Sequence, residues 1–306
     1  MSPARPSHMP FASLTRCLLP LLAGAALSAA LPAAAAESSA NLDANRDVAA
    51  KSGFLTDTNR TLPILFIVGD STVHNPGKGE RGWGDVIGKS FDPNKIRVEN
   101  HALGGRSSRT FITQGYWDMI LAAAKPGDFV LIQMGHNDGG ALNEEAPGSK
   151  YPLRARGTIR GLGEETQAID NVLTKQHEVV HTYGWYLRKY INDARAKGMT
   201  PILCSPIPHC PKEPVKAGDV EKSPYVEFSA AVARNEKVPF VNLNQITLSH
   251  YAGLTPAEIK AKYFSPADGT HTSPAGAELN AQSVVAGLKT LPDCPLAGCL
   301  KADAAK

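Results

Sequence analysis

Several features are scarce in this sequence, and each scarcity excludes a class of protein. The 306 residues carry a formal net charge of only +3, which gives no support for binding to nucleic acid. No apolar stretch is both long enough and unbroken enough to favour a membrane span. Internal repeats and strong domain boundaries are also absent, so the sequence predicts one folded domain rather than a repeat array.

The N-terminal segment has the pattern of an export signal. Arg5 and Arg16 precede the apolar residues 18–27, and a run of small residues follows up to Ala36. Charged, apolar and small-residue regions in this order are typical of a secretory signal peptide. We therefore expect cleavage after Ala36 and a protein that is secreted or periplasmic, with no membrane attachment once the signal is removed.

Cleavage divides the chain into three predicted parts. Residues 1–36 are the signal peptide, residues 37–60 a flexible leader and residues 61–306 the functional domain. Loss of the two signal arginines lowers the net charge from +3 to +1. The remaining length is ample for a single hydrophobic core, and we expect a monomer.

Four cysteines remain after cleavage, and an even number in an exported protein permits disulfide bonds. They are Cys204, Cys210, Cys294 and Cys299. A bond between Cys294 and Cys299 would close a small loop near the C-terminus, and Cys204 could pair with Cys210. Spacing alone decides neither pairing.

From residue 62 onwards, short apolar segments alternate with helical patterns, and Gly or Pro marks many of their ends. The predicted strands are residues 62–69, 96–102, 128–134, 200–205 and 238–243. The predicted helices are residues 82–90, 113–124, 178–197, 224–236, 256–262 and 274–290. This alternation predicts an α/β domain in which helices cover both faces of a five-stranded parallel sheet. Residues 139–173 are polar and weakly periodic, which predicts a long functional or mobile loop.

Polar segments follow the first three predicted strands. Ser71 lies just after the first, residues 100–109 follow the second, and residues 135–138 follow the third. Loops at the carboxyl ends of parallel strands converge on one edge of the sheet, where ligands usually bind. A fourth segment, residues 268–276, precedes the last helix and can fold back to the same edge.

These segments contain the parts of an acyl-transfer site. A serine hydroxyl is a poor nucleophile until a neighbouring base accepts its proton. Asp268 and His271 are close enough in sequence for one turn to hold both, with the aspartate stabilising the imidazolium. Taken alone, Ser71 would be better explained as a helix N-cap. No Gly-x-Ser-x-Gly motif surrounds it, which argues against a lipase of the α/β-hydrolase type.

In this order, the four segments resemble the SGNH (GDSL-type) hydrolases, and most closely the rhamnogalacturonan acetylesterases, a group of carbohydrate esterases. The similarity also includes residues 81–85, 180–190 and 268–278. It implies a three-layer α/β/α sandwich with a flavodoxin-like, five-stranded parallel sheet.

The resemblance also implies a role for each residue of the motif. Ser71 would be the nucleophile, His271 the general base, and Asp268 the residue that orients the imidazole. The backbone N–H groups of Ser71 and Gly105 and the side-chain amide of Asn137 would form the oxyanion hole. Fixed donors of this kind stabilise a tetrahedral oxyanion.

The implied activity is removal of acetyl groups from a pectic polysaccharide, rhamnogalacturonan, through an acetyl-enzyme intermediate. The expected partner is therefore an acetylated polysaccharide, and neither a metal nor an organic cofactor is required. Another esterase of the same fold, acting on xylan or on small acyl esters, is the nearest alternative.

Five further residues are candidates for substrate contact, each with a structural alternative. Arg106 or Arg109 could pair with a uronate carboxylate, although Arg109 is better explained by a structural ion pair. Trp83 could stack on a sugar ring or pack in the core. His136 could contact substrate or support the oxyanion-hole amide, and His209 could line a groove.

A second motif points to different chemistry. His177-Glu178-Val-Val-His181 matches the zinc-peptidase pattern, in which a helix holds two imidazoles one turn apart. Leu187 occupies the place where a third histidine would complete one extended form of that pattern. No second set of zinc ligands is evident, so a zinc peptidase ranks below the esterase. A non-catalytic sugar-binding protein ranks lower still, since it has no need for both Asp268 and His271.

Overall fold

A computed structural model describes residues 60–77, 79–149 and 152–302. The predicted signal peptide and nearly all of the predicted leader lie outside the described residues. Within the described part of the chain, every helix is too short or too polar to span a membrane.

A five-stranded parallel sheet forms the centre of the fold, as predicted. Its strands are β1 (Ile64–Gly69), β2 (Arg97–Asn100), β3 (Phe129–Gln133), β8 (Thr200–Cys204) and β9 (Phe240–Val241). Their spatial order is β2-β1-β3-β8-β9, which is flavodoxin-like. After β1 the chain continues to β2 on one side of the sheet, and after β3 it continues to β8 on the other side. The strand order therefore reverses between β1 and β3, and ligands bind at such a switch point.

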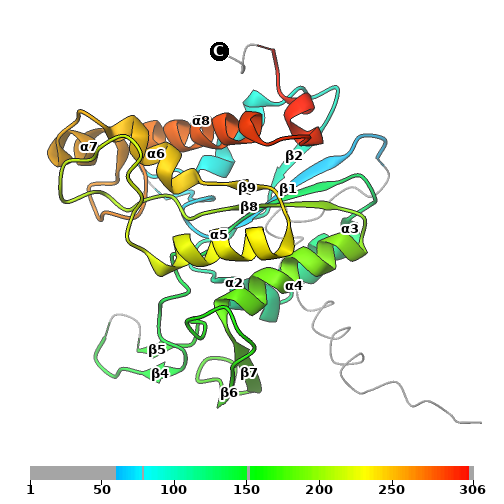
Figure 1. Ribbon diagram of the computed structural model, residues 1–306. Coiled ribbons are helices and arrows are strands. Elements are labelled where there is room, and N and C mark those ends of the chain that lie inside the picture. The colour runs from blue at the N-terminus through cyan, green and yellow to red at the C-terminus, as the bar shows by residue number, and fades with distance from the viewer. Residues whose placement is uncertain (1–59, 78, 150–151, 303–306) are drawn as a thin grey trace, which may run out of the picture.

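Helices cover both faces of this sheet, so the domain has three layers (Figure 1). One face packs on α2 (Ser108–Thr113), α3 (Tyr116–Ala123), α4 (Tyr183–Ala196) and α5 (Pro224–Glu236). The other face packs on α6 (Leu243–Tyr251), α8 (Pro274–Thr290) and the 3-10 helices η1 (Trp83–Asp85), η2 (Ile87–Ser90) and η3 (Pro295–Cys299). The helix α7 (Pro256–Tyr263) packs against α8.

Strand β1 is buried along its whole length because it feeds both cores. Phe66 and Val68 belong to the core on the α4 side, whereas Leu65 and Ile67 belong to the core on the α8 side. Each such side chain contributes about 1.5–3 kcal/mol of burial free energy relative to an exposed one. This packing fixes the end of β1, where the polar segment with Ser71 begins.

The predicted helix 178–197 is wrong at its start. Residues 177–181 form a strand, β7 (His177–His181), which pairs antiparallel with β6 (Thr166–Asp170). The helix begins only after Thr182, whose hydroxyl accepts a hydrogen bond from the Trp185 N–H. Tertiary pairing with β6 decided the conformation of a segment whose own pattern is ambiguous.

Two other helices differ from prediction, and one was not predicted. The segment 113–124 is interrupted because Gly115 has a φ of +79°, a left-handed conformation that ends α2 before α3 begins. Residues 82–90 form the two 3-10 turns η1 and η2 instead of an α-helix. The helix α6 was missed, whereas α5 and α8 match their predicted bounds.

The predicted long loop contains short strands. Within it, β4 (Glu144–Glu145) pairs with β5 (Leu153–Arg154), and β6 begins the pair with β7. Neither pair joins the central sheet. In Figure 1 both lie beyond the layer formed by α2 and α4.

The four cysteines in the described part of the chain are unpaired thiols, so neither disulfide that the spacing allows is formed in this structure. Cys204 and Cys294 are buried, and Cys210 and Cys299 are half-buried.

Candidate active site

The structure brings Ser71 and His271 into contact, although they are 200 positions apart in the chain. Ser71 lies in the turn after β1, and His271 lies shortly before α8. The distance from Ser71 Oγ to His271 Nε2 is 2.9 Å, a hydrogen-bond distance. This is the geometry in which an imidazole can accept the proton of a serine hydroxyl.

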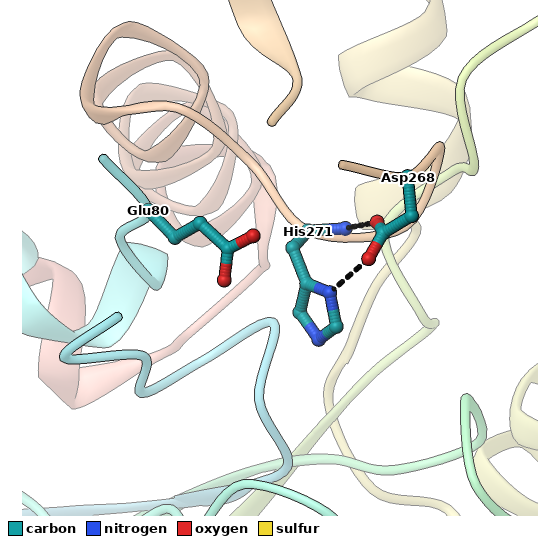
Figure 2. A group of neighbouring side chains, drawn as sticks. All are labelled: Glu80, Asp268 and His271. Atoms are coloured by element: carbon teal, nitrogen blue, oxygen red, sulfur yellow. Dashed lines mark hydrogen bonds and ion pairs between the residues drawn. The ribbon is translucent and has the colours of Figure 1, made fainter. Parts of the chain in front are cut away.

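Asp268 holds the imidazole through both oxygens of its carboxylate. One oxygen lies 2.7 Å from His271 Nδ1 (Figure 2), and the other accepts hydrogen bonds of 2.8 Å from the N–H groups of Thr270 and His271. Burial alone would raise the pKa of Asp268, but the hydrogen bonds from His271 and Thr270 outweigh burial and lower it. The carboxylate is therefore ionised at neutral pH and keeps the Nε2 side of the ring toward Ser71.

The loop that carries the histidine is fixed by its neighbours. Thr272 accepts a backbone hydrogen bond from Arg81 at 3.0 Å and returns one from its hydroxyl to the Arg81 carbonyl at 2.8 Å. Ser273 caps α8 by accepting the N–H of Gly276. A Cβ at Gly276 would lie 2.0 Å from the carbonyl oxygen of Tyr263, so this close approach requires glycine.

The three donors assigned to an oxyanion hole lie around the same cavity, whose volume is about 590 Å³. Among the described residues, the backbone N–H groups of Ser71 and Gly105 have no hydrogen-bond acceptor. Gly105 has a φ of +76°, which only glycine adopts without strain. Asn137 donates one amide hydrogen to the Arg106 carbonyl at 2.9 Å, which orients the side chain and leaves its second N–H for a ligand.

Two ionisable residues with buried side chains, Asp70 and His136, lie next to Ser71 and Asn137 in the sequence. Asp70 accepts hydrogen bonds from the N–H and hydroxyl of Thr72, and one of its oxygens lies 3.3 Å from His136 Nδ1. His136 Nε2 lies 3.1 Å from the Ile207 carbonyl. Burial opposes charge on both groups, but each charge stabilises the other, so the pKa of Asp70 is lowered and that of His136 is raised. His136 borders the cavity, and its two ring nitrogens face Asp70 and the Ile207 carbonyl rather than Asn137.

Of the other candidates for substrate contact, the structure excludes Trp83. Its side chain is fully buried, and its indole N–H donates to Gln133 at 2.8 Å, so it packs in the core and cannot stack on a sugar. His209 is exposed and pairs with Glu221 at 2.7 Å, but it does not line the cavity. Arg106 does line it.

Glu80 is a residue of this site that the sequence did not reveal. Figure 2 shows its carboxylate beside His271, with Asp268 on the other side of the ring in this view. A hydrogen bond of 2.8 Å from Asn75 holds it there. One atom from each of the three side chains lies within 4.8 Å of the others, a spacing that could also hold a cation. A cation there would compete for groups that Asp268 and His271 already use in their mutual hydrogen bond.

The zinc-peptidase motif does not form a metal site in this geometry. Residues four apart along an extended strand are separated by about 13 Å, too far for His177 and His181 to bind one ion. Glu178, the residue expected to act as base, instead forms two hydrogen bonds with the guanidinium of Arg109, at 2.6 and 2.7 Å. The motif is therefore structural, as Arg109 was expected to be.

A prediction follows from this strand. We expect His177→Ala, and separately treatment with EDTA, to leave hydrolysis of p-nitrophenyl acetate within about twofold of the untreated wild type, since a surface imidazole contributes little elsewhere. Initial rates after dialysis measure this. Loss of activity that zinc restores would contradict the assignment.

The three-layer fold and the serine–histidine contact at the carboxyl edge of its parallel sheet define the class of the protein, a carboxylic-ester hydrolase of the SGNH type. The chain belongs to the GDSL-like Lipase/Acylhydrolase family, whose model matches residues 67–279.

Similar proteins agree with this assignment. The chain is 29% identical over 236 residues to a Bacillus subtilis protein named "Probable rhamnogalacturonan acetylesterase YesY", covering 74% of this chain and 93% of that protein. It is 28% identical over 221 residues to the rhamnogalacturonan acetylesterase of Emericella nidulans, covering 72% and 82%. The crystal structure of the Bacillus subtilis protein YxiM has a similar fold, with a TM-score of 0.58 and 24% identity over 75% of this chain and 56% of that one.

Proposed function

We propose that this protein is an exported serine esterase that removes acetyl groups from rhamnogalacturonan. The observation that carries the proposal is the 2.9 Å contact between Ser71 and His271, beside two backbone N–H groups that have no acceptor in the described part of the chain. The names of two relatives, both rhamnogalacturonan acetylesterases, support acetylated rhamnogalacturonan as the substrate, because the match covers most of the length of both proteins.

In the proposed mechanism, Ser71 Oγ attacks the carbonyl carbon of the acetyl group while His271 Nε2 accepts its proton. The N–H groups of Ser71 and Gly105 and the amide of Asn137 then stabilise the oxyanion. His271 returns the proton to the sugar hydroxyl, which leaves, and an acetyl-enzyme remains.

Water completes the cycle by attacking the acetyl carbon of the acetyl-enzyme while His271 accepts its proton. The bond between the acetyl carbon and Ser71 Oγ then breaks, acetate leaves, and His271 returns the proton to Ser71 Oγ. Asp268 stabilises the imidazolium that forms in both steps through its 2.7 Å contact with Nδ1.

The test is the release of acetate from acetylated rhamnogalacturonan, acetylated xylan and p-nitrophenyl acetate under the same conditions. The proposal expects the highest kcat/KM for rhamnogalacturonan. A preference for xylan, or activity confined to the small ester, would favour the alternative esterases. N-terminal sequencing of the protein recovered outside the cytoplasm tests export and is expected to begin at Glu37.

The oxyanion-hole assignment makes a separate prediction. We expect Asn137→Ala to lower kcat by about 10²-fold to 10³-fold with little change in KM, because the donor acts on charge that develops only in the transition state. Stopped-flow or steady-state rates with p-nitrophenyl acetate measure the loss. Asn94→Ala, at an exposed position remote from the cavity lining, is the matched control and should not change kcat. A loss smaller than about fivefold in Asn137→Ala would remove this residue from the oxyanion hole.

A further inference from the structure

The charged residues on the cavity wall are all basic. Among the described residues that line the cavity with Ser71 and His271, three are arginines and none is acidic. They are Arg106, Arg154 and Arg156. Arg154 lies directly opposite Glu144 in the β4–β5 pair, so a carboxylate is available to it within the protein.

The other two arginines face the cavity without a carboxylate partner among the described residues. Arg106 is half-buried, and within the described residues its guanidinium contacts only neutral groups: the Gly104 carbonyl at 3.2 Å and the hydroxyl and ring of Tyr116. Its Nε is buried and has no hydrogen-bond partner in the described structure. Arg156 is also half-buried, and no ion pair or side-chain hydrogen bond involves it in that part of the chain. Half-buried guanidinium groups without counterions favour an anionic ligand.

Arg156 is held rigidly, although it lies outside the central sheet. Its N–H and that of Gly157 both donate to the Ala141 carbonyl, at 3.1 and 2.8 Å, and the Thr158 N–H donates to Asp138 at 3.0 Å. These bonds tie the segment to the residues that directly follow the oxyanion-hole amide.

Two glycines allow the segment that carries Arg156 to lie close to the segment that follows Asn137. A Cβ at Gly157 would lie 2.0 Å from the Gly140 carbonyl oxygen, and a Cβ at Gly140 would lie 3.2 Å from Arg156 Nε. The guanidinium stem therefore crosses the chain three residues after Asn137. Preorganisation of this kind lowers the entropic cost of binding.

Apolar side chains lie beside these charges. Leu153 and Leu173 are 38% and 51% exposed, which is unusual for large apolar residues in this domain, and both line the same cavity. A sugar ring presents apolar C–H faces, so a wall with leucines next to guanidinium groups suits an acidic sugar better than a simple acyl chain.

We infer that Arg156 and Arg106 form a carboxylate-binding subsite next to the acyl-transfer centre, which holds a uronate residue of an acidic polysaccharide. Leu153 and Leu173 contact the sugar rings. The planar guanidinium fork matches the two oxygens of a carboxylate. The assignment of this subsite to substrate recognition depends on the proposed esterase function.

The test measures binding independently of deacetylation of a polymer. Unacetylated trigalacturonate is used as a competitive inhibitor of p-nitrophenyl acetate hydrolysis, with neutral xylotriose as the control ligand. We expect trigalacturonate to inhibit the wild type, to inhibit less as ionic strength rises, and to inhibit better than xylotriose. In Arg156→Gln the inhibition constant should rise by roughly 10-fold to 100-fold, the range expected for loss of a charge-assisted hydrogen bond.

Two variants separate this subsite from a general effect on folding. Arg160→Gln changes an exposed arginine that does not line the cavity and should leave the inhibition constant unchanged. Arg156→Lys keeps the charge and should retain part of the affinity. In Arg160→Gln, kcat/KM for p-nitrophenyl acetate should match the wild type, and in both Arg156 variants it should change much less than the inhibition constant for trigalacturonate does.

Equal inhibition by trigalacturonate and xylotriose, or an unchanged inhibition constant in Arg156→Gln, would overturn the subsite. A loss of p-nitrophenyl acetate hydrolysis in Arg156→Gln that equals its loss of trigalacturonate binding would also overturn it, since the residue would then be structural. Failure of the enzyme to release acetate from rhamnogalacturonan is a different result, because it removes the proposed function while the inhibition data still decide the subsite.

Discussion

Ser71→Ala should lower kcat for acetyl esters by about 10⁴-fold or more, the largest effect expected of any single substitution in this protein. The variant lacks the oxygen that lies 2.9 Å from His271 Nε2, so no acetyl-enzyme can form. The oxyanion-hole donors remain, and they account for a residual rate above that of the uncatalysed reaction. Acetate release and p-nitrophenyl acetate hydrolysis measure the loss. Both assays use enough enzyme to detect a single turnover per active site.

Binding and folding should survive this substitution. Ser71 is half-exposed at the cavity, and removal of one hydroxyl there should change the free energy of unfolding by less than about 0.5 kcal/mol. Ser249→Ala, at an exposed serine of α6, is the matched control and should retain full activity. If Ser71→Ala retains a tenth of the wild-type rate, the nucleophile lies elsewhere.

The second large effect concerns stability. We expect Arg109→Leu to lower the free energy of unfolding by about 3–5 kcal/mol, because it leaves the Glu178 carboxylate without its partner in a poorly hydrated place. The Arg109 side chain is fully buried, and besides Glu178 it donates to the carbonyls of Leu142 and Gly157, each at 2.9 Å. One guanidinium therefore joins α2, β7 and the two segments that flank β4 and β5. Urea unfolding at neutral pH measures the loss.

The pH dependence gives this prediction a second readout. Burial alone would raise the pKa of Glu178, but the hydrogen bonds from Arg109 and Asn171 outweigh burial and lower it. A carboxylate whose pKa is lowered on folding adds stability above its ordinary value of 4.5, and this stability is lost as the pH falls through the lowered value. The difference in stability between wild type and Arg109→Leu should therefore narrow on acidification.

Two further variants control for this experiment. Arg234→Leu replaces an exposed arginine on α5 and should change stability by less than about 0.5 kcal/mol. The double variant Arg109→Leu, Glu178→Leu should recover part of the loss, because no charge is then left unpaired. A loss below about 1 kcal/mol in Arg109→Leu would show that the ion pair does not hold this region together.

The parts of the molecule that could be predicted from sequence are those with a local physical signature. The buried strands are short apolar runs, and the carboxyl edge follows from their parallel order. Asp268 and His271 could be paired because one turn spans them. Their contact with Ser71 was predictable because the first strand and the last helix both lead to the same edge of the sheet.

Other features depend on partners that are distant in the chain. The segment from His177 to His181 has no pattern that separates helix from strand, and its pairing with β6 decides the outcome. Trp83 lies in a polar, glycine-rich stretch that gives no sign of its burial against the sheet. Glu80 and Arg156 belong to no motif, and only the folded chain brings them to the cavity region.

The separation of the β4–β5 and β6–β7 pairs from the central sheet has an evolutionary consequence. Among its described residues, the segment that carries Leu153 and Arg156 contributes no hydrogen bond to the five main strands. Ser71 and His271, in contrast, depend directly on β1 and α8. Insertions and substitutions in that segment can therefore alter which polymer is recognised while the bond-breaking groups keep their geometry. Esterases with the same catalytic groups can therefore come to differ in their polysaccharide substrate through changes in this one segment.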